Sequence, residues 1–174
     1  YETFELNDVS ETVKSPETYN GDHTKWYGML YYKLIDCENY YTLIGWDGND
    51  KLTEKKIVDV LSFKPDGSPL FGKNVFTSIP KKYPKRLIIE FSGEGTISMK
   101  YHKDKDMIIY NHVAPPDPYL EGMYQYYVPD GSYDGLEYKR GNWTYMPAVD
   151  INNLPSKNDK VRKPKKKKAM FVPN

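Results

Sequence analysis

The feature that most constrains the fold is the regular spacing of turn signals in the sequence. Short runs of aromatic and β-branched residues end repeatedly at these signals. Asp-Gly pairs stand at 47–48, 66–67, 130–131 and 134–135, and such pairs adopt the positive φ of tight hairpin turns at little cost. No segment sustains the 3.6-residue apolar period of a helix. The sequence therefore predicts an all-β fold, an antiparallel meander that forms a sandwich or an open barrel.

The stretch from 107 to 149 organises the predicted sheet. It contains an apolar strand at 107–113, a proline-rich corner at 114–118, and aromatic strands beyond it. An irregular excursion with one short strand is expected at 69–84, where prolines interrupt the pattern. The other predicted strands are 1–6 at an edge, 26–36 in the centre, 40–46, 57–63, 86–92, 96–102, 124–128, 136–140 and 143–147.

Three hairpin registers follow from keeping the apolar side chains on one face. A hairpin in the middle of the chain is predicted to set Ile89 opposite Met99, and the next one to set Met99 opposite Tyr110. A later hairpin is predicted to set Tyr138 opposite Tyr145. A shift of one residue would turn every apolar side chain to the wrong face, so register is strongly specified here.

The length of 174 residues predicts one domain with a tail. Residues 1–25 are predicted to be an N-terminal edge strand and linker, 26–153 the β domain, and 154–174 an extended Lys-rich tail. The tail segment 155–174 carries eight basic residues and one acid, net +7, whereas the preceding residues carry 17 basic and 23 acidic residues, net −6.

This opposition of charge leaves three contacts open for the tail: the acidic body of its own chain, a protein partner, or anionic lipid. The block of four lysines at 165–168 has no interleaved arginine or aromatic residue, which does not favour nucleic acid, and no nucleic-acid partner is expected. The hypothesised partner-binding residues are Lys165, Lys166, Lys167, Lys168 and Phe171.

No motif for catalysis or for a cofactor stands out. The single cysteine, Cys37, excludes an internal disulfide and a cysteine-based zinc site. The predicted register places His102 and His112 on opposite faces, so no metal site is expected. Asp59 and Glu90 lie within strands and are expected to face solvent. The sequence predicts no catalytic, metal or cofactor residues, and a protein that is not an enzyme.

Aromatic residues offer an alternative function. Side chains alternate across a strand, so one ring of each Tyr pair at 31–32, 40–41 and 126–127 must face outward. Exposed rings suit protein interfaces. They also suit stacking on sugars, for which the candidates are Trp46 and Trp143. A glycan is thus the alternative ligand, and no other small molecule is expected.

Several specific motifs carry a resemblance to known proteins. They are Leu43-Ile44-Gly45-Trp46-Asp47-Gly48-Asn49, Asn111-His112-Val113-Ala114-Pro115-Pro116-Asp117-Pro118, Leu120-Glu121-Gly122, Tyr133-Asp134-Gly135 and Gly141-Asn142-Trp143. Over residues 26–152 they resemble the C-terminal half of uncharacterised exported proteins of the Bacteroidota. The resemblance implies a signal peptide and a further portion upstream, and a periplasmic or extracellular location at the cell envelope. It implies no activity, so it assigns no functional residue.

Together these features predict a non-enzymatic, envelope-associated protein-binding module, an accessory subunit of a larger assembly with the basic tail as one contact. A membrane-associated partner is among the options. The alternative is a carbohydrate-binding module that uses surface Trp and Tyr side chains.

Overall fold

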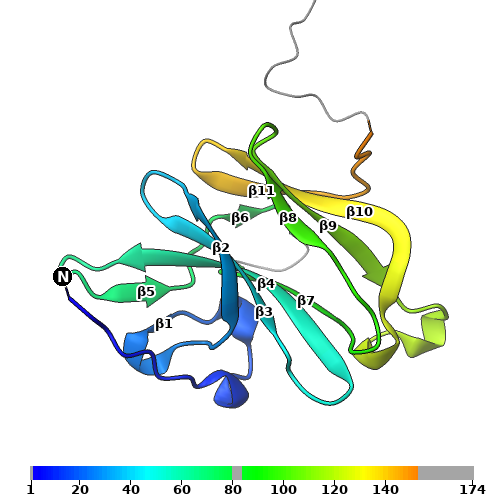
Figure 1. Ribbon diagram of the computed structural model, residues 1–174, viewed down its shortest axis with the longest axis horizontal. Coiled ribbons are helices and arrows are strands. Elements are labelled where there is room, and N and C mark those ends of the chain that lie inside the picture. The colour runs from blue at the N-terminus through cyan, green and yellow to red at the C-terminus, as the bar shows by residue number, and fades with distance from the viewer. Residues whose placement is uncertain (1, 80–83, 153–174) are drawn as a thin grey trace, which may run out of the picture.

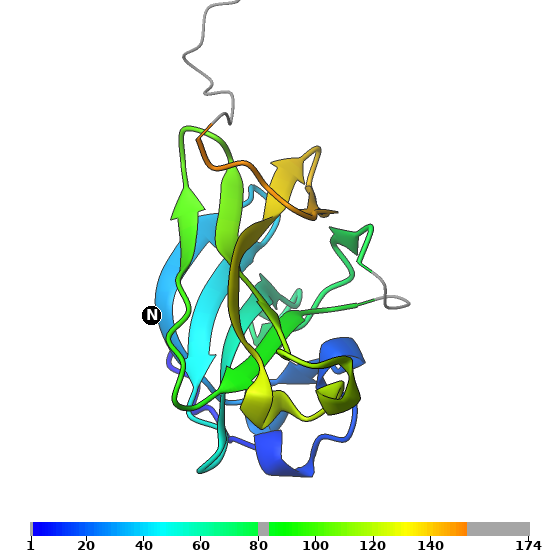
Figure 2. The ribbon, with the colours of Figure 1, turned by 90° about the vertical axis from the view of Figure 1, so that its right-hand side faces the viewer.

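The computed structural model describes residues 2–79 and 84–152, which form two β-sheets packed face to face (Figure 1, Figure 2). The described residues contain strands and short 3-10 turns and no α-helix. The all-β prediction is therefore confirmed, and of its two forms the sandwich is the correct one. The sheets stay open at their edges and do not close into a barrel.

The first sheet has the strand order β1-β5-β4-β3-β2, and β7 also pairs with β4. β4 is long enough to pair with β5 along its end and with β7 along its beginning. β3 lies along its other edge. The strands are β1 (Gly21–Asp22), β2 (Leu30–Asp36), β3 (Tyr41–Asp47), β4 (Thr53–Phe63), β5 (Pro69–Phe71) and β7 (Leu87–Ser92).

The second sheet has the order β6-β11-β10-β9-β8. Its pairs are antiparallel except β6 with β11, which run parallel. The strands are β6 (Phe76–Thr77), β8 (Met99–His102), β9 (Met107–Ala114), β10 (Val128–Lys139) and β11 (Asn142–Met146). The excursion predicted at 69–84 thus supplies one short strand to each sheet, β5 and β6.

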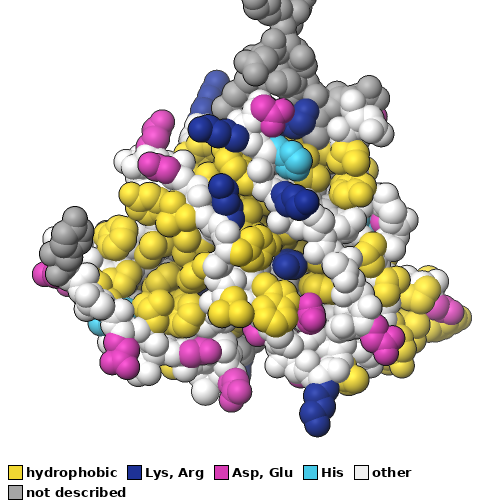
Figure 3. Space-filling view, viewed as in Figure 1, with side chains coloured by type: hydrophobic (Ala, Val, Ile, Leu, Met, Phe, Trp, Pro, Cys, Tyr) yellow, Lys and Arg dark blue, Asp and Glu magenta, His cyan; other side chains and the backbone are white. Residues whose placement is uncertain are grey.

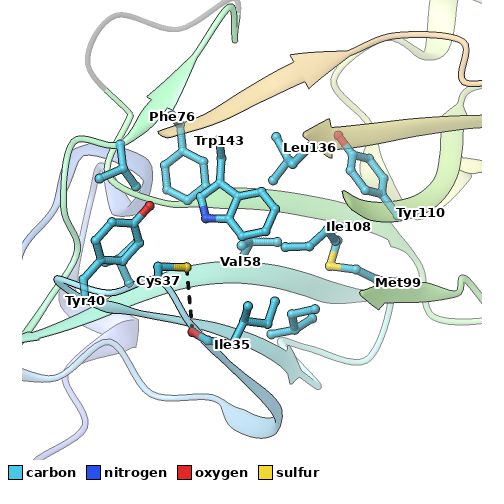
Figure 4. Packing of buried hydrophobic residues seen from close by; sticks show 13 residues of the cluster. Ile35, Cys37, Tyr40, Val58, Phe76, Met99, Ile108, Tyr110, Leu136 and Trp143 are labelled. Carbon is cyan, nitrogen blue, oxygen red and sulfur yellow. Dashed lines mark hydrogen bonds between the residues drawn. The ribbon is translucent and has the colours of Figure 1, made fainter. Parts of the chain in front are cut away.

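The main core lies between the two sheets (Figure 4). Alternate residues of each strand point into it, among them Ile44 and Val58 of the first sheet and Ile108 and Leu136 of the second. Trp143 lies among them, fully buried, and its indole Nε1 donates to Thr42 Oγ1 across the two sheets at 2.8 Å. This hydrogen bond satisfies the one polar atom that burial of the indole would otherwise leave without a partner.

Cys37 also lies in this core, where its Sγ contacts the carbonyl oxygen of Ile35 and Thr42 Oγ1 at 3.8 and 3.3 Å (Figure 4). Burial raises the pKa of the Cys37 thiol. A thiol held protonated in an apolar site is a poor nucleophile, so the side chain acts as a small core residue.

A second, smaller core lies on the outer face of the first sheet. Tyr27, Met29 and Ile57 form it, and Val13 and Tyr19 pack against it. Its cover is the N-terminal segment, which contains η1 (Ser10–Thr12), η2 (Pro16–Thr18) and η3 (His23–Lys25). Two further 3-10 turns, η4 (Pro118–Leu120) and η5 (Tyr124–Tyr126), stand between β9 and β10.

The N-terminal segment differs from its prediction. The edge strand expected at 1–6 does not form in the described residues 2–6. The chain is instead anchored at Asn7, whose backbone N–H donates to the carbonyl of His23 and whose carbonyl accepts from Trp26 N–H, both at 2.8 Å. Residues 7–25, predicted as a loop and linker, carry β1 and pack on the sheet. The domain boundaries themselves stay a prediction.

The first predicted hairpin is wrong, because its two strands belong to different sheets. Ile89 of β7 lies opposite Lys56 of β4, and β8 pairs only with β9 within the described chain. The apolar residues of both strands still face the same core, but from opposite sides. The register Met99 opposite Tyr110 is confirmed.

The third register is wrong by two residues. Tyr138 lies opposite Trp143 rather than Tyr145. Arg140 and Gly141 have φ values of 50° and 79°, and two positive φ values in succession close a two-residue hairpin turn. The turn therefore stands at 140–141, one residue earlier on the chain than the sequence suggested.

Two further strand predictions are corrected. The segment predicted as a strand at 124–128 forms η5 and joins β10 only at Val128. The segment predicted as the central strand at 26–36 forms β2, which lies at the edge of the first sheet. An apolar run on both faces is typical of a central strand, and here it instead leaves apolar side chains exposed.

Candidate functional site

Strand β2 is a free sheet edge that carries exposed apolar side chains. Within the described residues it pairs only with β3. Leu30, Tyr32 and Leu34 are 67%, 49% and 53% exposed. Its outer backbone groups are a template for another strand, and folded proteins usually protect such an edge. A free edge with exposed apolar side chains marks β2 as a candidate interaction site.

A shallow apolar groove of about 450 Å³ runs beside this edge on the outer face of the first sheet. Leu43, Leu61 and Phe71 line it together with Leu34 of β2 and Leu6 of the N-terminal segment. Figure 3 shows hydrophobic side chains gathered on this side of the molecule, over β2 and β5. The floor of the groove is buried at Leu43 and Phe71, whereas Leu34 and Leu6 at its sides are exposed.

A bulge limits how a partner could align with β2. The register with β3 shifts between Tyr31 and Lys33, so Tyr32 is the extra residue. Its hydroxyl donates to the Met99 carbonyl of the second sheet at 3.3 Å, and Lys56 Nζ lies 4.9 Å from its ring centre. Burial raises the pKa of Tyr32 to about 12, so the hydroxyl stays a donor at neutral pH.

Lys33, exposed on the same strand, is a further selective feature. A lysine on an edge strand discourages pairing with arbitrary strands, as does a bulge. Together the two features favour a partner of matching shape and charge over indiscriminate strand addition.

A second exposed apolar surface lies in the connection between β9 and β10. Tyr119 is 91% exposed, and Met123, Tyr124 and Tyr126 are between 42% and 47% exposed. The rings of Tyr124 and Tyr127 lie 5.0 Å apart. This loop presents side chains but no free strand edge, so it offers no backbone template.

The two tryptophans predicted for sugar stacking do not share a surface. Trp143 is fully buried in the main core, so its indole presents no face to a sugar. Trp46 is half-buried, and its Nε1 donates to Glu54 Oε2 at 2.8 Å. The outward rings predicted for the tyrosine pairs are present at Tyr32 and Tyr126.

The acid predicted to face solvent on β4 is buried. Asp59 does lie on the outer face of the sheet, but it is completely buried there beside Arg86, which donates to the Pro16 carbonyl of the N-terminal segment. Its Oδ2 lies 3.2 Å from Nη2 of Arg86, which is equally buried. Glu90 is half-buried and accepts from Thr53 Oγ1 at 3.0 Å. The sequence could not show this, because the covering segment is far away along the chain.

The hypothesised tail contacts, Lys165, Lys166, Lys167, Lys168 and Phe171, lie outside the described residues. Within the described ranges, no group of three or more His, Cys, Asp or Glu side chains is placed to hold a metal ion. None of the helical segments there has the length and apolar character needed to cross a membrane.

One polar cluster was missed from the sequence. His112 of β9 lies 2.8 Å from the carboxylate of Asp134 on β10, in a cavity between the two sheets. The spacing of 22 residues gave no signal, because the register of β9 with β10 is what brings these side chains together.

Comparisons of this chain with protein-family models, with curated proteins and with solved structures find no match. The candidate function is therefore argued from the geometry of the chain itself.

Proposed function

We propose that this chain is a non-enzymatic protein-binding module, an accessory subunit of a larger assembly, that accepts an extended partner segment along β2. The observation that carries the proposal is the free edge of the first sheet with Leu30 and Leu34 exposed upon it. In strand addition, the main-chain hydrogen bonds supply affinity and pockets for alternate side chains supply specificity. The groove beside β2 offers such pockets.

The energies involved are of the right size for specific binding. Complete burial of a leucine side chain contributes about 1.5–3 kcal/mol. Leu30 and Leu34 begin more than half exposed, so a partner that covers both gains a few kcal/mol from them alone. Association costs at least ~4 kcal/mol in lost freedom, so the ladder of hydrogen bonds and the groove must supply the remainder.

The basic tail is the second proposed contact, through Lys165 to Lys168 and Phe171. Its net charge of +7 over 155–174 suits an acidic partner surface. The envelope location belongs to the same proposal and rests on the resemblance to exported proteins.

Affinity capture from native cell envelopes tests the β2 contact. The bait is the intact chain, the Leu34→Glu variant, or the control Tyr119→Glu variant. Both variants place one carboxylate on an exposed apolar residue, but only Leu34 lies on the free edge. We expect a dominant protein that is recovered with the intact chain and the control and is lost with Leu34→Glu. Circular dichroism and the unfolding temperature establish that both variants fold.

Equal recovery with Leu34→Glu would overturn the contact at β2. Loss of the captured protein with Tyr119→Glu alone would place the contact at the connection between β9 and β10.

A chain ending at Asn153 adds a third comparison. We expect its association to be weaker and less sensitive to salt, because the screened attraction of the lysines is gone; unchanged binding would contradict the role of the tail.

The carbohydrate alternative now depends on Trp46, since Trp143 is buried. Binding to a glycan array that is lost on Trp46→Ala would favour it over a protein partner. Absence of binding to any glycan of a broad array would count against the carbohydrate alternative.

A further inference from the structure

The cluster around His112 is organised by one buried carboxylate. Asp134 is 5% exposed. Its Oδ2 accepts the Tyr145 hydroxyl at 2.9 Å and its Oδ1 accepts the Ala148 N–H at 3.0 Å. His112 Nδ1 lies 2.8 Å from Oδ2. Burial raises the pKa of Tyr145 to about 12, and the hydrogen bond to Asp134 adds to that rise, so the hydroxyl remains a donor.

These contacts fix the imidazole tautomer. An ionised carboxylate only accepts hydrogen bonds, so Nδ1 of His112 must donate to Asp134. A neutral ring then carries its lone pair on Nε2, on the side away from Asp134. The ring is 40% exposed, which leaves Nε2 accessible as a hydrogen-bond acceptor.

A second acceptor faces this nitrogen. Asp130 Oδ2 lies 3.8 Å from His112 Nε2, too far for a direct hydrogen bond. The other Asp130 oxygen accepts the Ser132 hydroxyl and N–H at 2.7 and 2.9 Å, and these bonds hold the pKa of Asp130 below its ordinary value. One donor atom about 2.8 Å from each acceptor would bridge the pair.

The cavity beside the cluster supplies an apolar wall. It has a volume of about 210 Å³ and lies between β7 of the first sheet and β9, β10 and β11 of the second. Ile79, Leu87 and Ile89 line one side, opposite His112 and Asp134. No Lys or Arg is among its lining residues in the described chain. The volume lies below the ~300 Å³ lower range of pockets for drug-sized ligands, so an occupant must be small.

We propose that a primary ammonium group binds between His112 Nε2 and Asp130 Oδ2, and that its short aliphatic chain enters the adjoining cavity and packs against Ile79, Leu87 and Ile89. The proposed ligand carries a positive charge at one end and is apolar along its chain. Two sources share it: a free alkylamine and the lysine side chain of another protein. Asp134 touches neither and acts by positioning His112.

A titration of the full chain with n-butylammonium, followed by the imidazole and amide NMR signals of His112, tests the site. We expect saturable shifts, and none with equal concentrations of butyrate or butanol. Asp130→Asn should weaken binding by about tenfold or more, because it removes the charge and keeps the shape. Asp117→Asn is the matched control: it alters another exposed aspartate that also caps a turn, and it should leave binding unchanged.

Equal shifts with butyrate, equal loss in the two Asp→Asn variants, or no shift at saturating amine would each overturn the proposal. Nα-acetyl-lysinamide distinguishes the sources. Binding as strong as that of butylammonium assigns the site to lysine side chains, and binding of butylammonium alone assigns it to a free amine.

Discussion

At the scale of single residues, the second core holds a fully buried ion pair. Arg86 Nη2 lies 3.2 Å from Asp59 Oδ2, and Arg86 Nη1 donates to the Pro16 carbonyl at 2.5 Å. The guanidinium also lies 5.0 Å from the ring centre of Tyr27. Such a pair adds little net stability over an apolar replacement, but removal of one partner leaves an uncompensated charge.

Arg86→Met should destabilise the fold by about 3–5 kcal/mol for this reason. The double variant Asp59→Leu/Arg86→Met should recover most of the loss, because no charge then remains buried. Urea unfolding of the two variants and the original chain measures both effects. If Arg86→Met were as stable as the original chain, Asp59 would have to be solvated and not buried.

Burial raises the pKa of Asp59 above its ordinary value of 3.8, and the Arg86 charge opposes that rise. A folded-state pKa above the unfolded one contributes stability at low pH that is lost as pH rises through the folded pKa. Without Arg86 the folded pKa rises further. The free energy of unfolding of Arg86→Met is expected to be lower than that of the double variant, and this difference should shrink as pH is lowered from neutral toward 3.8. A difference that grows on acidification would contradict this.

Trp143→Ala should cost about 3–5 kcal/mol, since it empties the centre of the main core. For a chain of this size that is a fall of roughly 10 °C in unfolding temperature. Trp46→Ala, at a half-buried position, should cost clearly less. Calorimetry compares the two. Similar small losses in both would place Trp143 at the surface, as the sugar-stacking hypothesis supposed.

At the scale of elements, the edge strand β2 and the N-terminal segment decide which faces of the first sheet stay open. The segment is held by its backbone: the Glu17 carbonyl accepts the N–H groups of Lys85 and Arg86 at 2.7 and 3.3 Å. Among residues 2–79 and 84–152, no strand pairs with the free edge of β2, and the bulge at Tyr32 and the charge of Lys33 are its protective features.

Lys33→Val should increase self-association, because it removes the charge from an apolar edge. Light scattering across a concentration series measures the effect. Lys100→Val on β8 is the control: β8 is also an edge strand, but its neighbour Met99 is buried. Equal behaviour of both variants would mean that β2 is not a specially exposed edge.

Deletion of residues 1–25 should destabilise the domain by several kcal/mol, a fall of about 10 °C or more in unfolding temperature. The deletion uncovers Tyr27 and Met29 and removes the carbonyl partners of Arg86. Thermal unfolding followed by circular dichroism tests it. An unchanged unfolding temperature would support the linker that the sequence predicted.

At the scale of the whole molecule, local sequence patterns predicted most of the strands, but not those wrongly expected at 1–6 and 124–128. They could not predict which distant segments pack together. The alternation around Met99 and Tyr110 correctly set that register, because both residues face one core. The sequence could not show that β7 and β8 part into different sheets, since either arrangement buries Ile89 and Met99. Nor could it show Asp59 covered by a distant segment, or Trp143 bonded to Thr42 across the core.

The measurement that tests the central claim most directly is hydrogen–deuterium exchange of the chain alone and in complex with the protein captured from envelopes. Strand addition at β2 predicts slower exchange of the amides of Leu30–Asp36 in the complex, because a partner strand occupies their free edge. Unchanged exchange along β2, with protection confined to the connection between β9 and β10 or to the second sheet, would contradict it.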